Sequence, residues 1–259
     1  NQTALVNGYS FTPEKWSLEA YQYIASEWAT IGRAYLMTIL VTVIGTALSL
    51  VITSTFAFAV SNDKLPGHKI LMFLCIFTML FNGGLVASYY VYSNIFHIKN
   101  TIWALIVPTF LMSPFNVVLV KNYFSNSISP SILEAARMDG AGVFAVFTKI
   151  VMPLSVPIMA TVGLMTAIGY WNDWTNGLYY LTENGGAQYY TIQLVLNRIN
   201  ENINFLANNS DVAANAAQQL PSTTMRMAIA VIGILPIMCA YPFFQKYFVK
   251  GITLGGVKE

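Results

Sequence analysis

Five long stretches of the chain contain no charged residue, and they constrain its fold more than any other feature. The stretches are residues 34–62, 70–96, 100–120, 150–172 and 227–245, with lengths of 29, 27, 21, 23 and 19 residues. A membrane-spanning helix needs about 20 mainly apolar residues, so each stretch has the length of a span. A transmembrane barrel would instead alternate in segments of about ten residues. The pattern therefore predicts an all-α fold, a polytopic transmembrane helical bundle.

The composition excludes several classes of protein. Only 9% of the 259 residues are charged, whereas a typical soluble domain carries about 25%. The net charge of +2 is too small for a nucleic-acid footprint. Cys75 and Cys239 lie in apolar stretches, where we expect buried thiols rather than a disulfide or a metal pair.

Missing motifs narrow the function further. The sequence has no phosphate-binding loop, no His-Glu-x-x-His motif and no Cys/His cluster. No charge lies within the five stretches, whereas membrane enzymes and proton-coupled carriers need ionisable groups there. What remains is a pore, a scaffold, or the permease of a transporter that is powered elsewhere.

The basic residues predict the orientation of the spans. The expected spans are residues 29–62, 70–96, 100–121, 150–177 and 224–248. Eight of the thirteen basic residues then fall on one side, and the positive-inside rule assigns that side to the cytoplasm. The carboxyl terminus and segment 122–149 would be cytoplasmic, and segment 178–222 would be extracytoplasmic.

The amino-terminal side of this topology poses a difficulty. The polar segment 1–28 would have to cross the membrane with no span before it, and the sequence begins with Asn1 rather than Met. We therefore expect that a sixth span, which would precede the others, is missing from this chain. The alternative is a protein of five spans.

One predicted cytoplasmic stretch carries a specific pattern. Pro130 is expected to begin a helix that Ser129 caps, and Gly140 and Gly142 are expected to break it. Two alanines within this helix would offer a small surface that another protein can approach closely. A second short helix would lead to Pro153, where the next span starts. The stretch is thus predicted to form a helix–break–helix elbow; the alternative is an ordinary amphipathic connector.

The spacing in the elbow fits the pattern E-A-A-x3-G-x9-I-x-L-P, which is typical of permease subunits of binding-protein-dependent ABC importers. The matching residues are Glu134, Ala135, Ala136, Gly140, Ile150 and Pro153. Met152 stands where Leu is usual, and this change conserves volume.

The resemblance covers nearly the whole chain. It is carried also by residues 81–85, 100–105, 113–116, 169–172 and 247–255. These stretches resemble carbohydrate importers of the maltose-permease type, and most of all the branch for polysaccharide-derived oligosaccharides, which includes alginate importers. The resemblance implies the fold of type I ABC importers, with six spans in each such subunit.

The resemblance also implies a division of labour. Two permease subunits, expected to be homologous and to form a heterodimer, would form the pathway. Two cytoplasmic ATPases would bind ATP and Mg, so the chain itself would hold no cofactor, and an extracytoplasmic solute-binding protein would deliver the oligosaccharide. The coupling helix, seated in a groove of one ATPase, would comprise Glu134, Ala135, Ala136, Arg137, Asp139, Gly140 and Ala141. The competing hypothesis is a membrane scaffold or channel subunit with no ATPase partner.

Candidate substrate-pathway residues end the fourth charge-free stretch. They are Tyr170, Trp171, Asn172, Asp173 and Trp174. Aromatic faces stack on sugar rings, and amide or carboxylate groups bond to hydroxyls. The alternative is an interfacial aromatic belt. Asn82 and Gly83 would shape the cavity where the second stretch is broken, and the alternative there is a packing kink.

The outer segment supplies the remaining candidates. Tyr189, Tyr190 and Gln193 resemble a stretch of the family that lies at the binding-protein face. Arg33, Arg198 and Arg226 are the cations close to the outer half. They would suit an acidic oligosaccharide such as alginate fragments, or alternatively face lipid headgroups.

Overall fold

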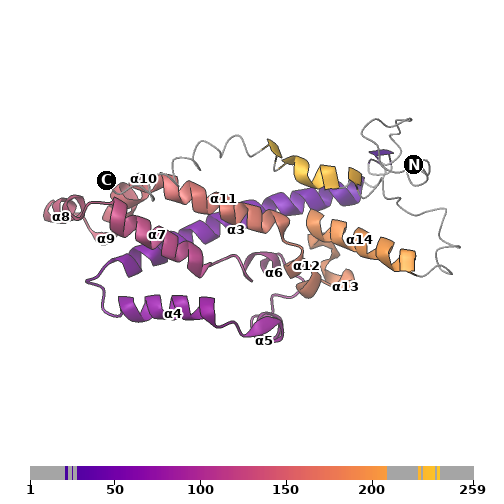
Figure 1. Ribbon diagram of the computed structural model, residues 1–259, viewed down its shortest axis with the longest axis horizontal. Coiled ribbons are helices and arrows are strands. Elements are labelled where there is room, and N and C mark those ends of the chain that lie inside the picture. The colour runs from indigo at the N-terminus through magenta and orange to yellow at the C-terminus, as the bar shows by residue number, and fades with distance from the viewer. Residues whose placement is uncertain are drawn as a thin grey trace.

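The computed structural model describes residues 21–22, 25, 28–208, 227–228, 230–236 and 238–239. These residues form helices joined by turns, with no strand among them, which confirms the predicted all-α class. The long helices run side by side in an elongated bundle (Figure 1). The elements are α3 (Trp28–Ser61), α4 (His68–Leu80), α5 (Gly84–Tyr90), η1 (Val91–Ile95), α6 (Trp103–Ile106), α7 (Pro114–Ser127), α8 (Pro130–Met138), α9 (Val143–Val146), η2 (Phe147–Val151), α10 (Met152–Leu154), α11 (Val156–Asn172), α12 (Thr175–Tyr180), α13 (Glu183–Gly186), η3 (Ala187–Tyr189) and α14 (Ile192–Asn208).

Helix α3 is the centre of the bundle, and α4, α7, α11 and α14 all contact it. Its buried face recurs every three or four residues and is built mainly from small side chains. That face comprises Ile31, Ala34, Thr38, Val41, Gly45, Ser49, Thr53, Ala57 and Val60. Small residues allow helices in a membrane to approach closely, so this face explains why α3 packs against several helices at once.

Within the described part of the chain, α3 alone is long and apolar enough to cross a membrane as one helix. Two bent helix pairs raise the number to three if each pair is one span. The pair His68–Leu80 and Gly84–Ile95 bends by 119°. This bend lies at the Asn82-Gly83-Gly84 sequence, which confirms the predicted break in the second charge-free stretch.

The second bent pair lies between the elbow and α11. Segments Val143–Leu154 and Val156–Asn172 meet at an angle of 79°. The break falls at Ser155, two residues after Pro153, and the expectation that the next span starts at Pro153 stays a prediction. Pro153 directly follows the π-helical turn η2, so it lies inside the helical segment Val143–Leu154 rather than at its start.

The third charge-free stretch is not one helix. Helix α6 ends at Ile106 and α7 begins at Pro114, and Thr109 between them has a φ of 70°. Pro108 and Pro114 predict kinks in this stretch, and the structure shows a complete break instead. A span that covers 100–121 as a single helix is therefore absent from the described residues.

Side chains from three other helices satisfy the backbone of this unwound segment. The bonds are Tyr170 Oη to the Ile106 carbonyl (2.7 Å), Asn176 Nδ2 to the Pro108 carbonyl (3.4 Å) and Ser49 Oγ to the Phe110 carbonyl (3.0 Å). A carbonyl without a partner is costly inside a membrane. The break therefore depends on donors that α3, α11 and α12 provide.

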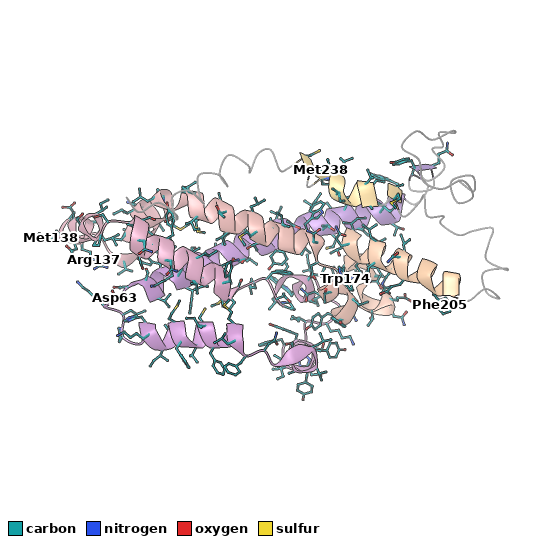
Figure 2. The ribbon with its side chains drawn as sticks, in the orientation of Figure 1. Asp63, Arg137, Met138, Trp174, Phe205 and Met238 are labelled. Carbon is teal, nitrogen blue, oxygen red and sulfur yellow. The ribbon has the colours of Figure 1, made fainter. Side chains whose placement is uncertain are left out.

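The segments assigned to opposite sides of the membrane lie at opposite ends of the bundle. Asp63, Arg137 and Met138 lie at one end, and Trp174 and Phe205 lie toward the other (Figure 2). This arrangement is in keeping with the predicted sides. The topology itself stays a prediction, and most of the expected last span, 224–248, lies outside the described residues.

Candidate functional site

The predicted elbow forms, with α8 at the tip of the bundle (Figure 1). Ser129 occupies the position before the helix and Pro130 is the first helical residue, as expected. The Ser129 side chain makes no capping bond, because its Oγ pairs with the Ser131 Oγ at 2.7 Å. The expected side-chain cap is therefore wrong, and the Ser129 carbonyl instead accepts the Ile132 N–H at 3.1 Å.

The end of α8 explains the spacing of the motif. The Ala141 N–H donates to the Ala136 carbonyl at 2.9 Å, and the Gly140 N–H donates to the Arg137 carbonyl at 3.0 Å. These two bonds, with Gly140 at a φ of 81°, form a Schellman motif. Ala136 and Ala141 both pack against the apolar cluster under the elbow. The pattern A-x3-G-A thus encodes a rigid stop at the end of α8.

The exposed surface of the elbow includes both charged and apolar side chains. Glu134, Ala135, Arg137, Asp139 and Gly140 are exposed, whereas Ala136 and Ala141 are half-buried. Both alanines of the motif were expected to face another protein, and only Ala135 is exposed; its contact with a partner stays a prediction. The missed signal lies next to the motif: Met138, Val143 and Phe144 are 89%, 69% and 78% exposed. This apolar tip is the surface of the elbow that a partner protein could bury.

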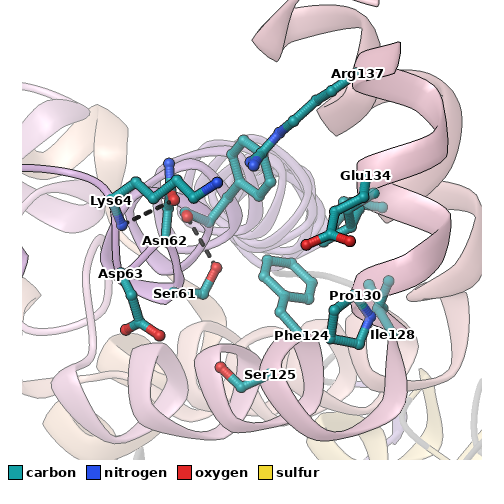
Figure 3. A pocket seen from close by; sticks show the side chains of 13 residues that line it. Ser61, Asn62, Asp63, Lys64, Phe124, Ser125, Ile128, Pro130, Glu134 and Arg137 are labelled. Atoms are coloured by element: carbon teal, nitrogen blue, oxygen red, sulfur yellow. Dashed lines mark hydrogen bonds between the residues drawn. The ribbon is translucent and has the colours of Figure 1, made fainter. Parts of the chain in front are cut away.

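A cleft of about 260 Å³ lies behind α8. The turn after α3, the end of α7 and the inner side of α8 form its walls (Figure 3). Its lining includes Phe58, Ser61, Asn62, Asp63, Lys64, Phe124, Ile128, Leu133, Glu134 and Arg137. The Glu134 side chain therefore lines the cleft, whereas Met138 of the apolar tip does not.

The candidate pathway residues Tyr170 to Trp174 do not face one cavity. Tyr170 is 1% exposed and bonded to the Ile106 carbonyl, and Trp171 is buried with its Nε1 donating to the Gly233 carbonyl at 3.3 Å. Asn172 and Trp174 are exposed. Tyr170, Trp171 and Asn172 end α11, where neighbouring positions point about 100° apart. Asp173 and Trp174 follow the end of that helix, so the five side chains diverge.

Asp173 has a local structural role. Its Oδ1 accepts the backbone N–H groups of Thr175 at 3.0 Å and Asn176 at 3.3 Å, at the start of α12. This is the bonding pattern of a helix cap. An Asp just before a new helix is a recognisable capping signal, and the sequence reasoning missed it.

The comparisons with known proteins decide the family. Residues 47–254 match the family described as "Binding-protein-dependent transport system inner membrane component". The chain belongs to this family. The polygalacturonan/rhamnogalacturonan transport system permease protein YtcP of Bacillus subtilis (strain 168) is 37% identical over 246 residues, which cover 95% of this chain and 83% of that protein.

Two further relatives agree. Protein LplC of the same organism is 36% identical over 95% of this chain and 80% of its own length. A crystal structure of a bacterial ABC transporter involved in the import of the acidic polysaccharide alginate matches with a TM-score of 0.79 and 28% identity, over 95% of this chain and 85% of that chain. The similarity confirms the type I ABC importer fold. The chain is a permease subunit located in the inner membrane; it is not itself an enzyme, because separate subunits carry the ATPase.

The end of the bundle opposite α8 holds the candidate binding-protein contacts. Tyr189, Tyr190 and Gln193 are each half-buried near the start of α14. The Arg198 guanidinium lies 4.3 Å from the centre of the Tyr190 ring and pairs with Glu183 at 2.9 Å. These contacts hold Tyr190 against Arg198. Their contact with a binding protein stays a prediction.

Asn82 and Gly83 are exposed at the bend between α4 and α5. The Asn82 Oδ1 accepts the Gly84 N–H at 2.8 Å, so Asn82 shapes the turn with its own side chain. This geometry supports the alternative reading, a kink made by local packing. A role of Asn82 and Gly83 in the substrate pathway stays a prediction.

Proposed function

We propose that this permease moves an oligosaccharide into the cytoplasm by alternating access, and that α8 couples the movement to an ATPase. The apolar tip at Met138, Val143 and Phe144 carries the proposal. Large exposed apolar side chains at the end of a bundle, away from its long apolar flanks, are typical of a protein-docking surface. The Schellman stop at Gly140 keeps α8 rigid, as the transmission of force requires.

The proposed assembly has four other subunits. A second, homologous permease would complete the pathway, and two ATPase subunits would bind at the end that carries α8. A solute-binding protein would deliver the oligosaccharide at the opposite end, near α12–α14. In this arrangement α8 and the carboxyl terminus lie in the cytoplasm, as the distribution of Lys and Arg predicts.

An acidic oligosaccharide is the proposed substrate. YtcP is named for polygalacturonan and rhamnogalacturonan, and the similar importer structure for alginate; polymers of uronic acids carry one carboxylate on each such sugar. Of the three arginines expected to bind these carboxylates, Arg198 is already paired with Glu183. Arg33 is exposed, and Arg226 lies outside the described residues. The choice of substrate thus draws on the relatives more than on a preformed cation site.

Co-purification tests the coupling role. The wild-type permease, expressed with its genomic ATPase partner, should retain that ATPase through affinity purification, and Gly140→Asp should lose it. Glu134→Ala is the companion variant, since it removes the negative charge of the motif but leaves the stop at Gly140 intact. If the ATPase never co-purifies with the wild type, the proposed coupling to an ATPase is wrong. The alternative, a scaffold or channel subunit with no ATPase partner, would then be favoured.

A second experiment tests the substrate class. The ATPase activity of the reconstituted complex should rise with a binding protein loaded with an oligouronate, and less with one offered neutral oligosaccharides of equal length. A flat response across both sets would contradict the sugar assignment. Equal stimulation by both would contradict only the acidic class.

A further inference from the structure

Three charged side chains in the cleft behind α8 have no ionic partner within the described residues. Lys64 comes from the turn after α3, and Glu134 and Arg137 come from α8. The fourth charged residue of the cleft, Asp63, lies 3.6 Å from His68 Nε2. Opposite charges thus share one small space without forming an ion pair.

The surroundings favour pairing of these charges if the cleft narrows. Apolar side chains line much of the wall, including Phe58, Phe124 and Leu133. Attraction between charges grows as water is displaced and the local dielectric constant falls. Lys64 and Glu134 point into the cleft from opposite sides (Figure 3), so a movement of α8 toward the end of α3 would bring them together.

We infer that Lys64 is a positioning residue: in one of the two transport states it pairs with Glu134 and fastens α8 to the end of α3. This inference rests on the proposed coupling role of α8. Arg137 cannot serve the same purpose, because it lies on the same helix as Glu134 and moves with it. Lys64 belongs to a different element, at the end of the helix that contacts α4, α7, α11 and α14. A pair with Glu134 would therefore pass a displacement of α8 directly to the centre of the bundle.

Charge removal at Lys64 is the first test. Lys64→Gln should lower the amount of oligosaccharide transported per ATP hydrolysed in proteoliposomes by about threefold or more, the change expected for an ion pair worth somewhat under 1 kcal/mol. Lys64→Arg should restore it. Lys69→Gln removes an exposed positive charge nearby that does not line the cleft, and it should behave like the wild type.

Cross-linking is the second test. Lys64→Cys combined with Glu134→Cys, with Cys75 and Cys239 replaced by Ala, should form a disulfide with different yields in the nucleotide-free and the vanadate-trapped complex. Equal yields in the two states, or a Lys64→Gln permease that couples like the wild type, would overturn the pair. Co-purification of the ATPase with Lys64→Gln separates this failure from a failure of the coupling role itself, because Lys64 does not lie on the apolar tip.

Discussion

Tyr170 of α11 lies with its ring against the backbone of Gly45 in α3. A Cβ atom on Gly45 would stand only 2.5 Å from the Tyr170 Cζ. The hydroxyl of the same ring reaches past α3 to the Ile106 carbonyl at 2.7 Å. The Tyr170 side chain thus sets the spacing between α3 and α11, and it also donates a hydrogen bond to the backbone where the chain unwinds.

Gly45→Ala should destabilise the permease by about 1–3 kcal/mol, because the added methyl group overlaps a buried ring that has no room to move. The thermal midpoint of the purified protein in detergent measures this effect. Gly32→Ala in the same helix is the matched control, since its Cβ would lie at an ordinary 3.5 Å from Trp28. Equal midpoints for the two variants would show that α11 can shift to accept the methyl group.

Tyr170→Phe should cost about 1–3 kcal/mol, because it leaves the Ile106 carbonyl without its donor while the ring packing is retained. The same thermal measurement applies. Tyr179→Phe, at a side chain that is 39% exposed, should leave the midpoint unchanged. A stable Tyr170→Phe protein would mean that the carbonyl finds another donor.

Gly140→Ala should uncouple transport from ATP hydrolysis without unfolding the bundle. A side chain at a φ of 81° costs about 1–2 kcal/mol, and no atom within 4 Å of the new Cβ adds a clash. Gly142→Ala has the same open surroundings at a φ of −67°, so it should transport normally. The readout is the transport rate divided by the ATPase rate, and identical ratios for both variants would contradict the role of the Schellman stop.

Met138→Ser and Phe144→Ser should each weaken binding of the ATPase by about tenfold, which corresponds to the loss of roughly 1.4 kcal/mol of apolar burial. Both side chains are exposed in the free permease, so its own thermal midpoint should not change. Asn126→Ala, exposed on α7 at the same end, is the control. Unchanged affinity in both serine variants would place the docking surface elsewhere.

Asp173→Asn distinguishes a cap from a sugar ligand. An Asn at this position still accepts the Thr175 and Asn176 N–H groups, so stability and transport should stay close to those of the wild type. Asp173→Ala should lose about 1 kcal/mol of stability. Loss of transport in a stable Asp173→Asn variant would instead support the predicted contact with substrate.

The sequence predicts the helical class and the elbow because both depend on local signals. Charge-free stretches fix the class, and Pro130 and Gly140 mark where α8 begins and ends. The angles at the breaks are not predictable in the same way. The 79° bend lies at Ser155 rather than at Pro153, because neighbouring helices decide which of several possible breaks is used.

For the candidate site, too, local signals predict the position of an element but not the directions of its side chains. The motif correctly marks the elbow, whereas the direction of each side chain follows from how α8 lies on α3 and α7. Ala136 turns inward and Glu134 faces a cleft for this reason. The cluster at residues 170–174 has the right chemistry for sugars. Tyr170 and Trp171, however, are buried and donate hydrogen bonds to carbonyls more than 60 positions away in the sequence.

The unwound segment between α6 and α7 also bears on how the chain is assembled. Its donor Ser49 precedes it in the sequence, whereas Tyr170 and Asn176 follow the carbonyls that they bond by 64 and 68 residues. During synthesis the segment therefore leaves the ribosome well before two of its three donors exist. Until α11 and α12 arrive, water or the insertion machinery has to satisfy these carbonyls, so the final seating of this segment comes late in membrane integration.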